Sequence, residues 1–242
     1  MPYLPRMHDD TIHGLTRNRS PSVGENPGDS SGAGRVEAVM ARLAAADPDP
    51  KAGLAVEDPF RLLVSVLLSA QSTGPTVARV SDALFARAAT PAALLALGEG
   101  TILDIVRPVG LGPSKTRAIV KLCAVLAETY GGEVPRTAVE LRRLPGIGRK
   151  SAEVTANFAF GEKVIAVDTH VFRVSNRIPL APGRTVDAVA DGLAALVPDS
   201  YKDGAHVWLF RHGRDTCTAR KPACGRCVVS DLCTWPEKTL TT

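Results

Sequence analysis

Four cysteines near the C-terminus have the residue type and the spacing to bind a metal centre. They follow the pattern C-x6-C-x2-C-x5-C and are Cys217, Cys224, Cys227 and Cys233. A zinc ribbon usually has two close C-x2-C pairs, whereas this segment has one. An iron–sulfur cube is larger than a single ion and tolerates uneven gaps between its ligands. The spacing therefore favours an iron–sulfur cluster, with a zinc ion as the alternative.

Basic residues surround this cysteine segment. Arg220 and Lys221 lie inside the first cysteine loop, and Arg211, Arg214 and Arg226 lie nearby. A cationic loop that a bound centre holds rigid suits the phosphate backbone of a nucleic acid. The alternative is that these cations neutralise the negative charge of the bound centre, and the two roles are compatible.

A glycine-rich turn at residues 144–152, LPGIGRKSA, is predicted to join two helices. Gly146 and Gly148 permit positive φ and leave backbone N–H groups open to a ligand. Because the next helix begins here, its free N–H groups and its dipole point at the same place, where a DNA phosphate fits. The GxxxxGK[ST] spacing of a P-loop is absent. A tight helix–helix turn without a ligand is the alternative.

Two residues near this turn could carry covalent chemistry. Lys150 lies in the first helical turn, where the dipole opposes a cation and lowers its proton affinity. A desolvated lysine amine can attack a carbon and form a Schiff base. By position alone, an ordinary phosphate-binding lysine is the more frequent case. Asp168 begins the segment DTHVFR, where its common role is to cap the following helix.

The elements that must position these residues are helical almost throughout from Arg35 onward. Asp58-Pro59 predicts a helix start, and Gly131-Gly132 predicts a helix end. Residues 163–167 are rich in β-formers but too few to imply a sheet. The predicted fold class is therefore all-α. Besides helices after Arg35 and over 60–70, helices are predicted near 75–88, 91–97, 101–107, 114–130, 138–144, 149–160, 169–177, 185–197 and 202–213.

Composition excludes several protein classes. The 242-residue chain is 45% hydrophobic with a net charge of +4, which allows one large domain or two modest ones. No apolar run approaches the length of a membrane span, and no secretory signal precedes the first helix, so we expect a cytoplasmic protein. Residues 1–34 are rich in Gly, Pro and Ser and are predicted to be a disordered tail. Cys123 lies in an apolar helix and is expected to be a core residue.

Several motifs together resemble the endonuclease III family of DNA base-excision glycosylases. They are LLSAQ at 67–71, VGLGPSK at 109–115, LPGIGRKSA at 144–152, VDTHVFR at 167–173 and the four cysteines. The resemblance implies a two-lobed helix-hairpin-helix fold with a C-terminal [4Fe–4S] cluster. It places a six-helix barrel at 52–162 and a cluster domain at 35–51 plus 163–242, with double-stranded DNA lying between them.

The resemblance also implies roles for individual residues. Lys150 matches the family's catalytic lysine and Asp168 its catalytic aspartate. Gln71 matches the residue that fills the gap left by an extruded base, and Leu111 matches a wedge at the opposite strand. His170 is expected to contact DNA. The implied activity is that of a bifunctional glycosylase and abasic-site lyase.

In the implied reaction, the lysine displaces an oxidised pyrimidine, forms a Schiff base with the sugar and cleaves the strand by β-elimination. Its substrate is double-stranded DNA that carries an oxidised pyrimidine or an abasic site. We expect a monomer that acts at the nucleoid and has no membrane association.

Departures from the family pattern leave two alternatives. Gly112-Pro113 follow Leu111 where the family often has a tyrosine and a polar residue, and Gly74 stands where an acid is frequent. One alternative is a low-activity or noncatalytic lesion-binding variant of the same fold. The other is a mismatch adenine glycosylase. Ser65 stands where that branch would have an acid, and the sequence ends at Thr242 without that branch's added recognition domain, so this alternative is disfavoured.

Overall fold

The computed structural model describes residues 32–52, 56 and 58–239. Within them the chain forms eleven α-helices and one short 3₁₀-helix with no strand, so the predicted all-α fold class is confirmed. Residues 163–167, the β-rich run, form neither a helix nor a strand. The predicted tail lies outside the described residues except for Gly32–Gly34, which already belong to the first helix. No described helix combines the length and apolar composition needed to cross a bilayer.

Short connections separate the helices, and capping residues set many of their starts. Asp58 accepts a hydrogen bond from the Phe60 N–H at 2.8 Å, directly before Pro59. In chain order the elements are α1 (Gly32–Ala46), α2 (Pro59–Ser69), α3 (Gly74–Phe85), α4 (Pro91–Leu97), α5 (Glu99–Val106), α6 (Gly112–Thr129), α7 (Ala138–Leu141), α8 (Arg149–Phe160), α9 (Thr169–Arg177), α10 (Val186–Leu196), α11 (Asp199–Asp215) and the 3₁₀-helix η1 (Cys224–Arg226).

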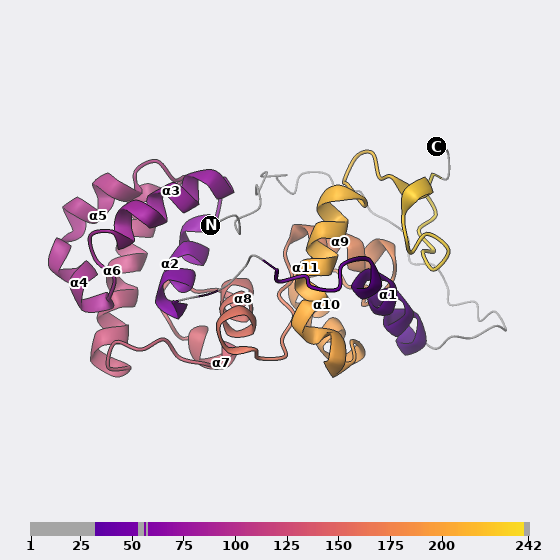
Figure 1. Ribbon diagram of the computed structural model, residues 1–242, viewed down its shortest axis with the longest axis horizontal. Helices are drawn as coiled ribbons and strands as arrows, with labels where there is room; N and C mark the ends of the chain where they lie inside the picture. Colours follow the sequence, from indigo (N-terminus) through magenta and orange to yellow (C-terminus); the bar gives the residue numbers. More distant parts are fainter. Residues whose placement is uncertain (1–31, 53–55, 57, 240–242) are drawn as a thin grey trace.

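Two large hydrophobic cores divide the molecule into two lobes, which Figure 1 shows next to one another along the long axis, and a small third cluster comprises Val66, Val154 and Ala166. The first lobe contains α2–α8, and the second contains α1 and α9–α11 with the C-terminal loop. Helix α1 comes first in the chain but packs on α10 and α11, where Val36, Val39 and Met40 are fully buried. The second lobe is therefore assembled from both ends of the described chain.

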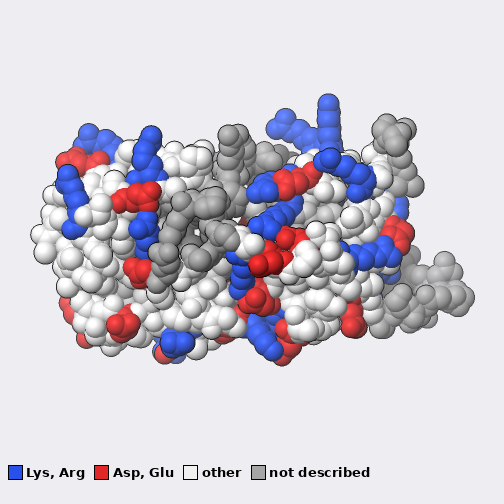
Figure 2. Space-filling view, in the orientation of Figure 1, with Lys and Arg blue, Asp and Glu red and all other residues white. Residues whose placement is uncertain are grey.

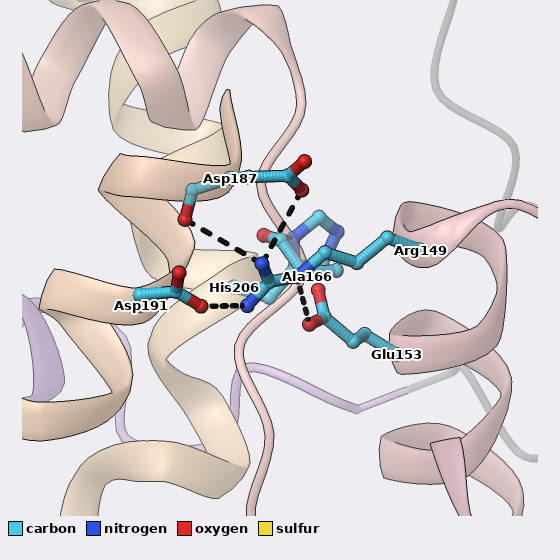
Figure 3. Close-up of polar contacts among 6 residues, drawn as sticks. All are labelled: Arg149, Glu153, Ala166, Asp187, Asp191 and His206. Carbon is cyan, nitrogen blue, oxygen red and sulfur yellow. Dashed lines mark hydrogen bonds and ion pairs between the residues drawn. The ribbon is translucent and has the colours of Figure 1, made fainter. Parts of the chain in front are cut away.

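One arginine joins the two lobes (Figure 3). Arg149 begins α8, and its Nε donates to Glu153 Oε1 at 2.8 Å on the same helix. Its Nη atoms contact Asp187 Oδ1 at 3.3 Å and Asp191 Oδ1 at 2.7 Å on α10. Burial raises the pKa of Glu153, and the Arg149 guanidinium opposes this rise. Because Arg149 is the residue before Lys150, this contact also fixes the start of the helix that carries Lys150.

Replacing Arg149 with methionine should destabilise the protein by about 2 kcal/mol, or about 4–8 °C in Tm, because the buried Glu153 carboxylate loses its counter-ion. The pKa of Glu153 then rises further, so the loss is largest at neutral pH and shrinks as the pH falls and the carboxyl becomes protonated. Thermal unfolding of both proteins across pH 5.5–8 measures this. Asp191→Ala, an exposed partner, is the control and should cost less than about 1 kcal/mol. A pH-independent difference would contradict the assignment.

Candidate functional site

The glycine-rich turn lies between α7 and α8, as predicted, and its two glycines do different things. Gly146 has φ +78°, and a Cβ there would meet the Ala118 Cβ at 2.9 Å. Gly148 has φ −84°, so of the two glycines only Gly146 uses the positive φ that glycine permits. A Cβ at Gly148 would meet no described atom within 4 Å. The backbone at the start of α8 is therefore open, which suits an anion approaching its N–H groups.

Lys150 is the second residue of α8; the residue is half-buried, and its amine is surrounded by protein atoms. Burial lowers the pKa of Lys150, and the Asp168 carboxylate opposes this decrease. The sequence predicted a lowered proton affinity from the helix dipole, and in the structure desolvation lowers the pKa in the same direction. Among the described residues the ammonium has no hydrogen-bond acceptor and no ion-pair partner within 4 Å. An amine held this way loses its proton more easily than a surface lysine and can act as a nucleophile.

Asp168 is the N-cap of α9, as its position in the sequence predicts. Its Oδ1 accepts hydrogen bonds from the N–H groups of His170 at 2.9 Å and Val171 at 2.8 Å. These bonds fix the carboxylate, whose charge favours the protonated forms of both Lys150 and His206. The structure therefore brings Lys150 and Asp168 into one electrostatic environment from two different lobes.

Sequence reasoning missed His206, which lies in the same environment. It is buried on α11, with its Nδ1 2.8 Å from the Ala166 carbonyl oxygen (Figure 3). Burial lowers the pKa of His206, Asp168 raises it and Lys150 lowers it again. A neutral imidazole with Nδ1–H donating to Ala166 fits these surroundings. A single histidine in the middle of a helix carries no motif, so the sequence offered no signal for it.

His170 packs within the second lobe and is partly exposed. Its ring lies 5.1 Å from the Phe210 ring, and its Nδ1 lies 3.2 Å from an Arg173 nitrogen. Gly213 packs against the backbone of the same residue, because a Cβ on Gly213 would lie 3.1 Å from the His170 carbonyl oxygen. These contacts fix His170 two residues after Asp168.

Gln71 and Leu111 lie on two loops of the first lobe and share an unusual backbone conformation. Their φ angles are 52° and 61°, and they are the only described residues other than glycine with positive φ. This region costs L-residues roughly 1 kcal/mol, so surrounding contacts must hold it. The Leu111 side chain is 55% exposed although it is large and apolar. The exposed side chain and the strained backbone together make Leu111 a candidate for contact with a ligand.

The four cysteines line one cavity together with Arg177 and His212. Within the described chain no three Cys, His, Asp or Glu side chains converge closely enough to hold a single metal ion. Burial raises the pKa of the Cys227 thiol, and the other three cysteines add to this rise. Four thiolates gathered at one cavity therefore need a positively charged centre to balance them. The donor set of four cysteine thiolates fits an iron–sulfur cluster, which these residues would hold.

Arg177, which sequence reasoning also missed, holds the cationic loop. Its guanidinium donates to the carbonyl oxygens of Thr218 at 2.7 Å and Ala219 at 2.8 Å, and stacks 4.0 Å from the centroid of the Trp235 ring. Arg220 and Lys221 follow directly and are exposed. Figure 2 shows Lys and Arg projecting from the second lobe on the side of the C-terminal loop, with Asp and Glu among them. This placement allows contact with a phosphate backbone.

Two family models match the chain. One is described as the HhH-GPD superfamily base excision DNA repair protein and matches residues 64–199. The other is the iron-sulfur binding domain of endonuclease III and matches residues 217–233, the segment bounded by the first and last of the four cysteines. The matches thus include the glycine-rich turn, Lys150, Asp168 and the cysteine loop.

Similar proteins point in the same direction. Endonuclease III of Escherichia coli K12 is 46% identical over 200 residues, which covers 83% of this chain and 95% of that protein. Endonuclease III of Haemophilus influenzae is 45% identical over 204 residues, covering 84% and 96%. A solved structure of a trapped endonuclease III–DNA covalent intermediate aligns with a TM-score of 0.75 and 39% identity, covering 81% of this chain and 92% of that one.

Proposed function

The chain belongs to the HhH-GPD superfamily of base excision DNA repair proteins, and on that premise we propose that it excises oxidised pyrimidines and cleaves abasic sites in double-stranded DNA. It is a DNA glycosylase with abasic-site lyase activity of the endonuclease III type, and it binds a [4Fe–4S] cluster. The observation that carries the proposal is the buried amine of Lys150 within the field of the Asp168 carboxylate.

In the proposed reaction the target nucleotide leaves the base stack, because its glycosidic bond is hidden inside the duplex. The neutral Lys150 amine attacks C1′, and the base departs with the electron pair of the C1′–N bond and takes up a proton. Asp168 receives the proton that the attacking amine loses, and its charge stabilises the cationic sugar. The C1′–O4′ bond of the sugar then breaks, its electron pair stays on O4′, which takes up a proton, and a Lys150–C1′ Schiff base forms. This Schiff base makes the C2′ proton acidic, and loss of that proton breaks the C3′–O bond and expels the 3′ phosphate.

The remaining site residues are proposed to hold DNA. Gln71 would fill the gap left by the extruded base, and Leu111 would wedge at the opposite strand. Gly146 and Gly148 would present backbone N–H groups to one phosphate, while His170, Arg220 and Lys221 would contact others. This assignment is supported by the exposed Leu111 side chain and by the open backbone at Gly148.

The wider arrangement belongs to the same proposal. The barrel would comprise residues 52–162, and the cluster domain 35–51 plus 163–242. The four cysteines would hold the cluster, which would keep the Arg220–Lys221 loop rigid. We propose that the protein acts as a monomer on DNA in the cytoplasm, at the nucleoid. The Ser65 hydroxyl lies 2.7 Å from the Ser81 hydroxyl, so a neutral pair occupies the place where an adenine glycosylase would have an acid.

A panel of duplexes tests the substrate class. The cluster-loaded protein is incubated with oligonucleotides containing thymine glycol, 5-hydroxycytosine, an abasic site, 8-oxoguanine or undamaged bases, with and without borohydride. We expect strand cleavage and a covalent adduct on the two oxidised pyrimidines and on the abasic site. Binding to these duplexes without any product would support the noncatalytic alternative. Product from A·8-oxoguanine mispairs alone would support the adenine glycosylase.

A further inference from the structure

The two strained loops that carry Gln71 and Leu111 lie against each other in the first lobe. Gln71 follows the end of α2, and Leu111 directly precedes α6. A Cβ added to Gly110 would lie 2.6 Å from the Gln71 carbonyl oxygen, which is closer than real Cβ atoms come to an oxygen. The two backbones therefore touch at the position of Gly110, and a side chain there would push the Gln71 loop away.

Lys115 ties the same two loops together from inside. It lies one turn into α6, is 5% exposed, and its backbone N–H donates to the Leu111 carbonyl oxygen at 3.0 Å. Its ammonium donates to the carbonyl oxygens of Leu68, at 2.8 Å, and Ala70, and to the Ser72 hydroxyl at 2.9 Å. These acceptors lie on both sides of Gln71 in the chain.

The charge of Lys115 fits this arrangement. The last carbonyl groups of a helix have no partner within the helix, and a cation there also complements the helix dipole. Burial lowers the pKa of Lys115 to about 8, so the ammonium form still predominates at neutral pH. Three oxygen acceptors use its three N–H donors fully. All three hydrogen bonds of the Lys115 ammonium, which lies outside the reaction centre, therefore go to residues next to Gln71.

We propose that Lys115 and Gly110 act as positioning residues. They hold the loops of Gln71 and Leu111 at a fixed separation, so that both side chains can insert into the DNA duplex together. The inference rests on the proposed role of Gln71 and Leu111 in DNA. Both residues are held at positive φ, and a loose loop would let each relax to an ordinary backbone conformation. Opening a duplex needs the Gln71 and Leu111 side chains at a fixed separation, because misplacing a contacting group by about an ångström can lower the reaction rate strongly.

The test compares DNA that must be opened with DNA that is already open. Lys115→Met and Gly110→Ala are measured as cluster-loaded proteins under single turnover, on a thymine glycol duplex and on a single-stranded abasic oligonucleotide. We expect the single-turnover rate of both variants to fall about 10- to 100-fold on the duplex and no more than about twofold on the single strand. Gly100→Ala is the matched control, since a Cβ there meets no described atom within 4 Å, and it should leave both rates unchanged.

A double-mutant cycle then shows whether Lys115 acts through Gln71. In the Gln71→Ala background, Lys115→Met should lower the rate on the duplex by less than about a further threefold. Equal losses of rate on the duplex and on the single strand would overturn the proposal and leave Lys115 a structural residue. Fully additive losses of rate in the cycle would do the same. If Lys115→Met does not fold, Gly110→Ala alone decides in the same way. If Gln71→Ala and Leu111→Ala leave the duplex rate unchanged, the proposed DNA role of these two residues fails instead.

Discussion

Replacing Lys150 with glutamine should abolish the covalent adduct that borohydride traps on abasic DNA and reduce strand cleavage on the order of 10⁴-fold or more. The amide has no nucleophilic lone pair, so neither the bond to C1′ nor the Schiff base can form. Affinity for the same duplex should change less than about threefold, because the described contacts of Lys150 include no hydrogen bond that holds the hairpin. Gel-resolved trapping and fluorescence anisotropy measure the two quantities.

The stability of this variant gives a second, independent reading. Burial lowers the pKa of Lys150, which means that the folded protein disfavours its ammonium form. Removing the charge should therefore leave Tm unchanged or raise it. Lys121→Gln, an exposed lysine on α6, serves as the control and should retain full trapping. Adduct formation by Lys150→Gln at the wild-type rate would show that another amine is the nucleophile.

Local signals predicted the helices well where caps and prolines set their limits. The predicted spans 149–160 and 169–177 match α8 and α9, because a glycine turn precedes the first and Asp168 caps the second. The first helix begins at Gly32 rather than Arg35, although its buried residues begin only at Val36, and its packing against α10 and α11 does not explain the added residues. Residues 163–167 have β-propensity, but no neighbouring strand exists among the described residues to pair with them.

The site was predictable only as far as motifs reach. Lys150 and Asp168 stand in recognisable segments, so the sequence could name them, but it could not show how far folding desolvates the amine and lowers its pKa. His206 approaches from α11, far along the chain, and Lys115 acts on a loop more than forty residues earlier. Such contacts depend on how helices pack, which spacing in one sequence does not encode.

Replacing Asp168 with asparagine should slow base excision about 10²- to 10³-fold while the protein stays folded. Asparagine caps helices as well as aspartate does, so its side-chain oxygen can keep the bonds from the His170 and Val171 N–H groups. What disappears is the negative charge that favours a cationic sugar and accepts the lysine proton. Single-turnover kinetics should show a lower rate constant for base excision, while the Kd for DNA stays within about threefold of the wild-type value.

The pH dependence distinguishes this electrostatic role from a purely structural one. Asp168 raises the pKa of Lys150 against the effect of burial, so without its charge the pKa of the amine falls further. The acidic limb of the rate profile, which reports Lys150 losing its proton, should therefore move to lower pH in Asp168→Asn. Asp168→Ala should show the same shift and also lose about 1 kcal/mol of stability with the cap. An acidic limb that stays in place in both variants, with the rate falling only in Asp168→Ala, would show that Asp168 matters only as the cap of α9, and that the amine of Lys150 titrates without its help.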